Sequence, residues 1–192
     1  MPWEKQFDVD QALTKAMEAF WARGYEATSM QDLIRCMGVN RGSIYATFGD
    51  KRSLFIQALR RYDETQRAGR LDGLSRRLGP RAAILAAFDG AIETALNGGH
   101  EGCFLVNTAL ELSPHDAEIA GVVAHGLDQT EAFFRDCLRR GRDAGEVAAA
   151  VDPVETGRAL LSLFLGLRVL ARSRPERPLL TSIAHQAAAL LD

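Results

Sequence analysis

Cysteine is scarce in this chain of 192 residues, and its spacing excludes several classes of protein. The three cysteines, Cys36, Cys103 and Cys137, are odd in number and form no CxxC pair. Disulfide scaffolds and zinc sites need paired or closely spaced cysteines, so the sequence favours neither. We expect reduced thiols, with Cys36 and Cys137 in structural roles.

Long apolar runs are also missing. The first residues, MPWEKQFDVDQAL, contain no continuous apolar segment of the kind that signal peptides carry. The longest apolar stretch, around residues 159–167, is far shorter than the roughly 20 residues that cross a membrane. The sequence therefore predicts a cytoplasmic protein that does not interact with membranes.

The motifs of common enzymes are absent as well. The chain contains no GxGxxG, GxxxxGK[ST], HExxH or GxSxG pattern, and its four histidines show no metal-ligand spacing. We therefore predict no enzymatic activity, no cofactor and no metal site. One remote enzymatic alternative remains, in which Cys103 is a nucleophile and His100 its base, but the sequence identifies neither an orienting third group nor an oxyanion site.

What is present is an ordinary globular composition with uneven charge. Hydrophobic residues make up 47% of the chain and charged residues 25%, close to the average of folded domains. Residues 1–70 hold 11 Lys and Arg against 9 Asp and Glu, a net charge of +2, whereas residues 71–192 hold 12 against 16, a net charge of −4. This asymmetry supports nucleic-acid binding by the first part only weakly.

The most informative stretch is residues 28–54, TSMQDLIRCMGVNRGSIYATFGDKRSL. Its first apolar residues recur at positions 30, 33, 34 and 37, which places them on one face of a short helix over residues 29–37. A second short helix over residues 41–48 follows, with Ile44 and Phe48 toward the core. Two short helices joined by a three-residue turn that contains glycine are typical of a helix-turn-helix.

The ends of the first of these helices have recognisable signals. Thr28 is expected to cap it, and Gln31, three residues later, to close a capping box. Gly38 is expected to end it in the left-handed conformation, and Asp50 to cap the helix that follows the motif.

The same reasoning predicts an all-α protein of about nine helices. We expect a three-helix head, residues 1–55, for DNA binding, and a larger helical body, residues 56–192, to which the family resemblance described below assigns ligand binding and dimerisation. The expected helices cover residues 9–23, 29–37, 41–48, 50–74, 80–96, 103–112, 114–138, 153–173 and 178–191.

At this level of detail the head resembles the DNA-binding domain of the tetracycline-repressor (TetR) family. The resemblance covers about the first 60 residues, and a second phrase, GCFLVN at residues 102–107, resembles a variant of some members. It implies a homodimeric regulator, usually a repressor, whose body binds a small molecule and thereby weakens DNA binding. The matching head residues are Ala19, Phe20, Gly24, Tyr25, Thr28, Ser29, Met30, Ile34, Gly38, Val39, Gly42, Ser43, Ile44, Tyr45, Phe48, Lys51 and Leu54.

By position, the resemblance implies which head residues meet a double-stranded DNA operator. Base contacts fall on Arg41, Gly42 and Ser43, and phosphate contacts fall on Thr28, Tyr45, Thr47 and Lys51. Physical chemistry supports several of these roles, because helix N-termini attract phosphates and an arginine can donate two hydrogen bonds to guanine. Many members carry histidine where Thr47 stands, which weakens the prediction for that position.

In the body, apolar residues with a few polar neighbours are candidates to line a pocket for an unknown small-molecule effector. Polar groups on apolar helices need partners, which makes Asn107 and Arg168 the most informative of them. Arg168 suits an anionic or carbonyl-bearing ligand, although an ion pair with Glu111 is the simpler expectation. The candidates are Phe88, Ile92, Cys103, Phe104, Asn107, Leu110, Val123, Leu127, Phe134, Phe164 and Arg168.

Two further predictions concern a thiol and the dimer. Cys103 lies at an expected helix N-terminus, where a thiolate is favoured, so a repressor switched by oxidants or electrophiles is the near alternative to a ligand-released one. The last two helices are very apolar, and Gly157, Ser162 and Gly166 would let another helix approach. The residues alone fit burial within one chain and pairing with a second subunit equally well, and the family resemblance favours a homodimer through these helices. A constitutive DNA-binding module whose body only dimerises is the third possibility.

Overall fold

The computed structural model describes residues 7–98 and 102–192, and within these ranges it confirms the all-α class. The described residues form ten α-helices, one π-helical segment and no strand. In chain order these are α1 (Val9–Arg23), α2 (Met30–Met37), α3 (Arg41–Phe48), α4 (Lys51–Tyr62), η1 (Asp63–Ala68), α5 (Gly69–Arg77), α6 (Pro80–Leu96), α7 (Phe104–Glu111), α8 (Ala117–Asp143), α9 (Pro153–Ser173) and α10 (Arg177–Ala189).

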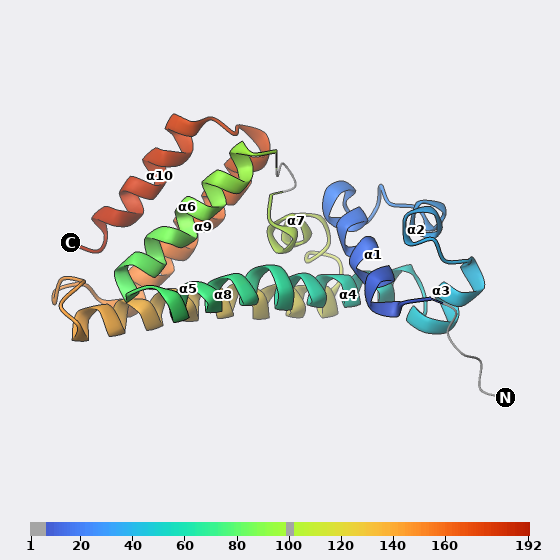
Figure 1. Cartoon of the computed structure of the whole chain (residues 1–192), viewed down its shortest axis with the longest axis horizontal. Helices are drawn as coiled ribbons and strands as arrows, with labels where there is room; N and C mark the ends of the chain where they lie inside the picture. Colours follow the sequence, from blue (N-terminus) through green and yellow to red (C-terminus); the bar gives the residue numbers. More distant parts are fainter. Residues whose placement is uncertain (1–6, 99–101) are drawn as a thin grey trace.

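One predicted helix, over residues 50–74, is divided in the structure. It begins as α4, passes through the π-helical turns of η1 and continues as α5 without leaving the helical region, so the rod stays continuous (Figure 1). Periodicity did not indicate this change of winding, because the polar residues of η1 carry no apolar pattern. A π-helical segment within an α-helix is uncommon and is frequently found at functional sites.

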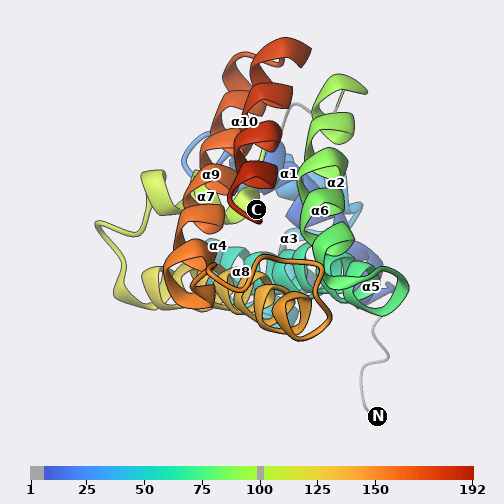
Figure 2. The ribbon, with the colours of Figure 1, turned by 90° about the vertical axis from the view of Figure 1, so that its left-hand side faces the viewer.

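The helices form a head and a body at opposite ends of this rod. Figure 1 shows α1, α2 and α3 gathered at one end, on the right, while α4, η1 and α5 run beside α8 toward the other end. Figure 2 looks along the rod and shows α6, α9 and α10 standing above α5 and α8. The short helix α7 lies between the two groups (Figure 1).

Two hydrophobic cores hold this arrangement together. The first joins α1 to α4 with α7 and the start of α8, and the second joins α5 and α6 with the rest of α8, α9 and α10. The predicted division at residue 55 falls inside α4, whose buried residues belong to the first core. Residues of the body thus complete the core of the head.

Helix ends follow local capping chemistry, with two corrections to the predictions. Ser29, not Thr28, is the N-cap of α2, and Asp32, not Gln31, closes the capping box with Ser29. The long helix α8 begins at Ala117 and not at residue 114, because the carboxylate of Asp116 accepts the N–H groups of two residues in its first turn. The expected left-handed glycine is confirmed at Gly38, with φ of 69°.

None of the helices in the described ranges is long and apolar enough to cross a membrane.

Candidate nucleic-acid interface and adjoining cavity

Helix α3 exposes one face to solvent and packs its opposite face against the first core. Ile44 is 0% exposed and Phe48 is 3% exposed, as predicted, and both belong to the first core. On the other side Arg41, Gly42 and Tyr45 are exposed, and Ser43 and Thr47 are half-buried. The helix is therefore fixed by its inner face while its outer face stays open, as a helix that enters a DNA groove requires.

The exposed face of α3 begins with an ordered pair of side chains. The Arg41 guanidinium carbon lies 5.6 Å from the centre of the Tyr45 ring, an arrangement that allows a cation–π contact. Gly42 lies beside them, and a Cβ atom there would meet only the Asn40 side-chain oxygen, at 3.5 Å. The first turn of α3 therefore has an open backbone beside a positioned cation.

The predicted phosphate contacts are placed differently from one another. Thr28 is fully buried, and its hydroxyl donates a 2.7 Å hydrogen bond to the carbonyl of Gly24. Its side chain is therefore not available to a phosphate in this structure. Ser29 is the exposed hydroxyl residue at the start of α2, and its spacing to Asp32 was the sequence signal that would have identified it.

Lys51 is the first residue of α4, and an aromatic ring holds its side chain. The ammonium nitrogen lies 4.2 Å from the centre of the Tyr25 ring. Burial is the main cause that raises the pKa of Tyr25, followed by the charge of Glu26, so this ring stays neutral beside the lysine. The cation is thus kept at a helix N-terminus, where phosphate groups are attracted.

Charged groups tie the start of α4 to the start of α8. The Arg52 guanidinium donates to both carboxylate oxygens of Asp116, at 2.6 and 2.9 Å, and to Glu118 at 2.9 Å. Hydrogen bonding from Arg52 is the main reason that the pKa of Asp116 falls to about 2. The ion pair therefore persists at every pH at which the protein would work.

A second tie joins α7 to the link between α1 and α2. The Glu111 carboxylate accepts hydrogen bonds from the backbone N–H groups of Tyr25, at 3.2 Å, and Glu26, at 3.0 Å. Gly24 has φ of 85°, and a Cβ atom at this position would lie 2.9 Å from a Glu111 oxygen. The expected ion pair between Glu111 and Arg168 is wrong, because this carboxylate faces the head.

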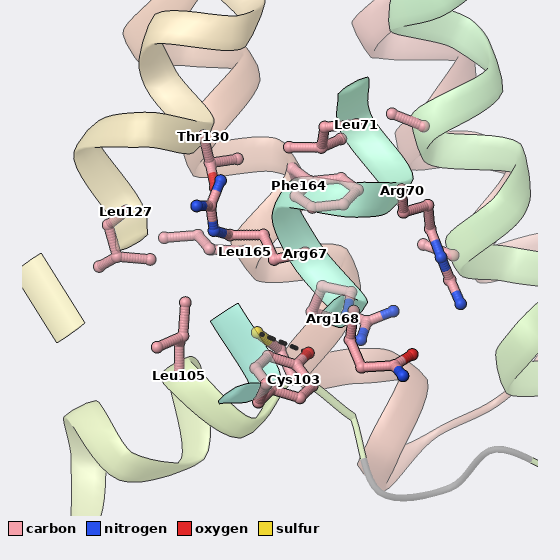
Figure 3. Close-up of a pocket in the computed structure, with 14 residues that line it drawn as sticks. Arg67, Arg70, Leu71, Cys103, Leu105, Leu127, Thr130, Phe164, Leu165 and Arg168 are labelled. Atoms are coloured by element: carbon pink, nitrogen blue, oxygen red, sulfur yellow. Dashed lines mark hydrogen bonds between the residues drawn. The ribbon is translucent and has the colours of Figure 1, made fainter. Parts of the chain in front are cut away.

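Beyond these ties, the body encloses a cavity of about 50 Å³ next to the junction of α4 and η1. Helices α5, α6, α8 and α9 and the start of α7 complete its wall (Figure 3). It is lined by Tyr62, Gln66, Arg67, Arg70, Leu71, Ala87, Ala91, Cys103, Leu105, Leu127, Thr130, Phe164, Leu165 and Arg168.

Four of the eleven predicted effector residues line this cavity, namely Cys103, Leu127, Phe164 and Arg168. Five others are core residues that do not reach its wall: Phe88, Ile92, Phe104, Val123 and Phe134.

The last two predicted effector residues lie elsewhere. Leu110 is 74% exposed, and with Asn107 it borders a separate groove between the head and α9. Sequence reasoning missed Gln66, Arg67 and Arg70 because a polar run after an amphipathic helix is typical of a solvent-facing linker.

The polar end of the cavity contains a short chain of contacts. The buried Tyr62 hydroxyl donates to the Cys103 sulfur over 3.6 Å, and Arg168 donates to the carbonyl of Gly102 at 2.6 Å. Burial is the main cause that raises the pKa of Tyr62, and Cys103 raises it further. The hydroxyl therefore remains a hydrogen-bond donor toward the thiol.

The three thiols differ in accessibility. Cys103 is the half-buried N-cap of α7, as its expected place at a helix start required. Cys137 is buried, and burial raises the pKa of its thiol, whereas Cys36 is exposed. His100, the base of the enzymatic alternative, lies outside the described residues.

Two family comparisons cover most of the chain. Residues 12–58 match the family described as "Bacterial regulatory proteins, tetR family", and residues 80–185 match the family described as "Tetracyclin repressor-like, C-terminal domain".

Individual proteins agree with these matches. The chain is 35% identical to the uncharacterized HTH-type transcriptional regulator YezE of Bacillus subtilis, over 74% of each chain. It is 31% identical to the HTH-type transcriptional repressor ComR of Escherichia coli, over 94% of this chain and 87% of ComR. Its fold is similar to that of a cysteine mutant of the TetR family transcriptional regulator CifR solved with operator DNA, with a TM-score of 0.84, 30% identity, and coverage of 96% of this chain and 97% of CifR.

Proposed function

Because the chain belongs to the TetR family of bacterial transcriptional regulators, we propose that it is a repressor that binds a palindromic operator as a homodimer and is released by a small molecule. The observation that carries the proposal is the outer face of α3, which is open while Ile44 and Phe48 hold the helix from behind. Arg41 and Gly42 would meet base edges in the major groove, with Ser43 behind them, while Tyr45, Lys51 and the start of α2 would hold phosphates. Such a repressor would act in the cytoplasm, where it can reach operator DNA.

The enzymatic alternative is not retained. Both matching families and the similar proteins are transcriptional regulators, which agrees with the prediction that the chain is not an enzyme.

Dimerisation is proposed through α9 and α10. Much of the apolar surface of α9 is already used within the chain, because Leu160 and Leu167 are fully buried and Gly157 faces Arg135 of α8. The outward face nevertheless carries Ser162 and Gly166, and a Cβ atom at Gly166 would meet open space. Small exposed residues of this kind allow a helix of a second subunit to approach closely.

The rod of α4, η1 and α5 connects the cavity to the DNA-facing end. Tyr62 and Gln66 line the cavity, while Lys51 begins the same rod at the head. A ligand that binds better to a body conformation in which the two heads are spaced wrongly for successive grooves would shift the population away from DNA binding. The ties made by Arg52 and Glu111 would carry the movement of the body to the head.

Titration of the protein with its own upstream DNA tests this function. We expect a shift in electrophoretic mobility at low salt, with an affinity that falls steeply as salt rises because phosphate contacts release counterions. Replacing Lys51 by Gln should weaken binding. It should also reduce the magnitude of the slope of log affinity against log salt by about one for each head, because each head loses one phosphate contact.

The matched control is Arg77→Gln, which removes one charge from the exposed end of α5. It should leave the salt slope unchanged. Absence of any shift at low salt for the wild type would contradict the proposed function, and an unchanged slope for K51Q would contradict the phosphate role of Lys51.

A thiol-switched repressor is the second candidate. It is favoured by the position of Cys103, whose half-buried sulfur faces the cavity and accepts a hydrogen bond from Tyr62. A covalent adduct on this sulfur would occupy the cavity as a ligand does.

The expected result for this candidate is that N-ethylmaleimide releases DNA from the wild type but not from Cys103→Ser. Cys36→Ser, which removes the exposed thiol of α2, is the control and should respond like the wild type. Equal release from the wild type and C103S would exclude the candidate.

A further inference from the structure

The wall of the cavity has an unbalanced charge. Three of its 14 lining residues are arginines, Arg67, Arg70 and Arg168, and none of the 14 is an aspartate or glutamate. The arginines come from η1, α5 and α9, so they converge only in the folded chain. Figure 3 shows all three beside the apolar residues of the same wall.

One of these charges is neutralised from outside the wall. Arg67 forms an ion pair with Asp63, one turn earlier in η1, and only 12% of the Arg67 side chain and 13% of the Asp63 side chain are exposed. Its second hydrogen bond, from Nη2 to Asp63, is 3.0 Å long. Arg67 therefore needs no other anion.

Among the residues that the structure places, the other two arginines have only neutral partners. In the ranges that the structure describes, neither Arg168 nor Arg70 has a carboxylate within ion-pair distance. Arg168 donates to the Gly102 carbonyl at 2.6 Å, and Arg70 approaches the Thr94 hydroxyl at 3.4 Å. A guanidinium has five N–H donors, so each retains donors for a ligand.

The position of Arg168 makes a negative ligand favourable. Its side chain is partly buried, and a charge removed from water without a counter-charge is unfavourable unless an anion compensates it. Arg70 is exposed and lies toward the solvent side of the same wall. An anion entering past Arg70 would meet increasing attraction on its way to Arg168.

The other residues of the cavity wall are mostly apolar, so a ligand that fits the wall would carry an apolar part beside its anionic group. Leu71, Leu127, Phe164 and Leu165 face the cavity together with the small side chains of α6. The volume of about 50 Å³ is smaller than the cavity of about 150 Å³ that accommodates benzene in another protein, so the body is small or displaces side chains of the wall.

We propose that this cavity binds a small organic carboxylate, with its charged group on Arg168 and its apolar part against Phe164 and Leu71. The inference rests on the proposed function in treating the cavity as the effector site. Such a ligand would draw α9 toward η1 and α5, and thus act on the rod that leads to Lys51.

Direct binding to the free protein tests the ligand class without DNA. The probes are benzoate and hexanoate, each compared with its own neutral amide, benzamide and hexanamide, by isothermal titration calorimetry at up to millimolar concentration. We expect at least one carboxylate to bind about tenfold more tightly than its amide, because charge-assisted hydrogen bonds are about twice as strong as neutral ones.

Variants then locate the charge. Arg168→Gln should remove the preference for the carboxylate, and Arg70→Gln, on the exposed side, should reduce it with the fold intact. Arg76→Gln, an exposed arginine of α5, is the control and should keep the wild-type preference.

Three results would overturn the proposal: equal binding of carboxylates and amides, binding of no carboxylate at millimolar concentration, or a preference for the carboxylate that survives in R168Q. The DNA titration is independent of these measurements. Carboxylate binding without any DNA shift would contradict the repressor function but support the ligand class. A DNA shift without carboxylate binding would support the repressor function but contradict the ligand class.

Discussion

Replacing Phe55 by Ala is expected to lower the free energy of unfolding by about 3–5 kcal/mol, the range for truncating a buried aromatic ring. Phe55 is 0% exposed, and its ring centre lies 5.0 Å from those of Phe20 and Tyr25 and 5.4 Å from that of Phe104. These neighbours come from α1, the link after it, and α7. One side chain of α4 therefore joins the head to the body.

The F55A substitution should also weaken DNA binding, because the void left by the Phe55 ring loosens the packing of the head against α7. Phe88→Ala is the matched control, since Phe88 is equally buried but packs against Phe134 and Phe164 in the second core. Chemical denaturation gives the stability of both variants. DNA titration at a temperature where both are folded should then show a larger loss for F55A, and equal losses would mean that the first core does not position the head.

Replacing Arg41 by Ala is expected to weaken operator binding by about 1–3 kcal/mol for each head that uses it, roughly 5-fold to 150-fold. The reason is that a guanidinium in the first turn of α3 can donate two hydrogen bonds to guanine. The loss should be specific, so that binding to a scrambled sequence of the same length changes much less. Arg41→Lys should not restore discrimination, because an ammonium lacks the planar fork of donors.

Arg60→Ala is the matched control for this variant. Arg60 is an exposed arginine of α4 that lies toward Glu118 of the body, 3.9 Å from its carboxylate. The R60A substitution should change the affinity for operator DNA and for scrambled DNA only slightly, and by the same factor. If R41A weakened binding to both DNAs by the same factor, Arg41 would contact phosphates and not base edges.

Much of the head could be predicted from the sequence because its structure depends on local interactions. The spacing of apolar residues over residues 30–37 set the inner face of α2, and the glycine after Met37 adopts the left-handed conformation that was expected of it. Ile44 and Phe48 are buried for the same reason. The error at Thr28 was also local, since two neighbouring hydroxyl residues both suit an N-cap and only the hydrogen bonds distinguish them.

The cavity could be predicted only in part. Cys103 and Arg168 stood out because polar groups on apolar helices need partners, and both line the cavity. The arginines of η1 and α5 did not stand out, since a charge in a polar run is usually solvated. Their role depends on α9 facing them, and no local pattern specifies that pairing.

The sequence by itself determined that the chain is all-α, that residues 28–54 form a helix-turn-helix, and which face of α3 is open, because each of these follows from interactions within a few residues. Only the tertiary structure decided that Glu111 binds the head, that Phe55 joins the two halves and that Arg67, Arg70 and Arg168 share one wall. These contacts join residues far apart in the chain. They depend on how the helices pack against one another, which no spacing along the chain records.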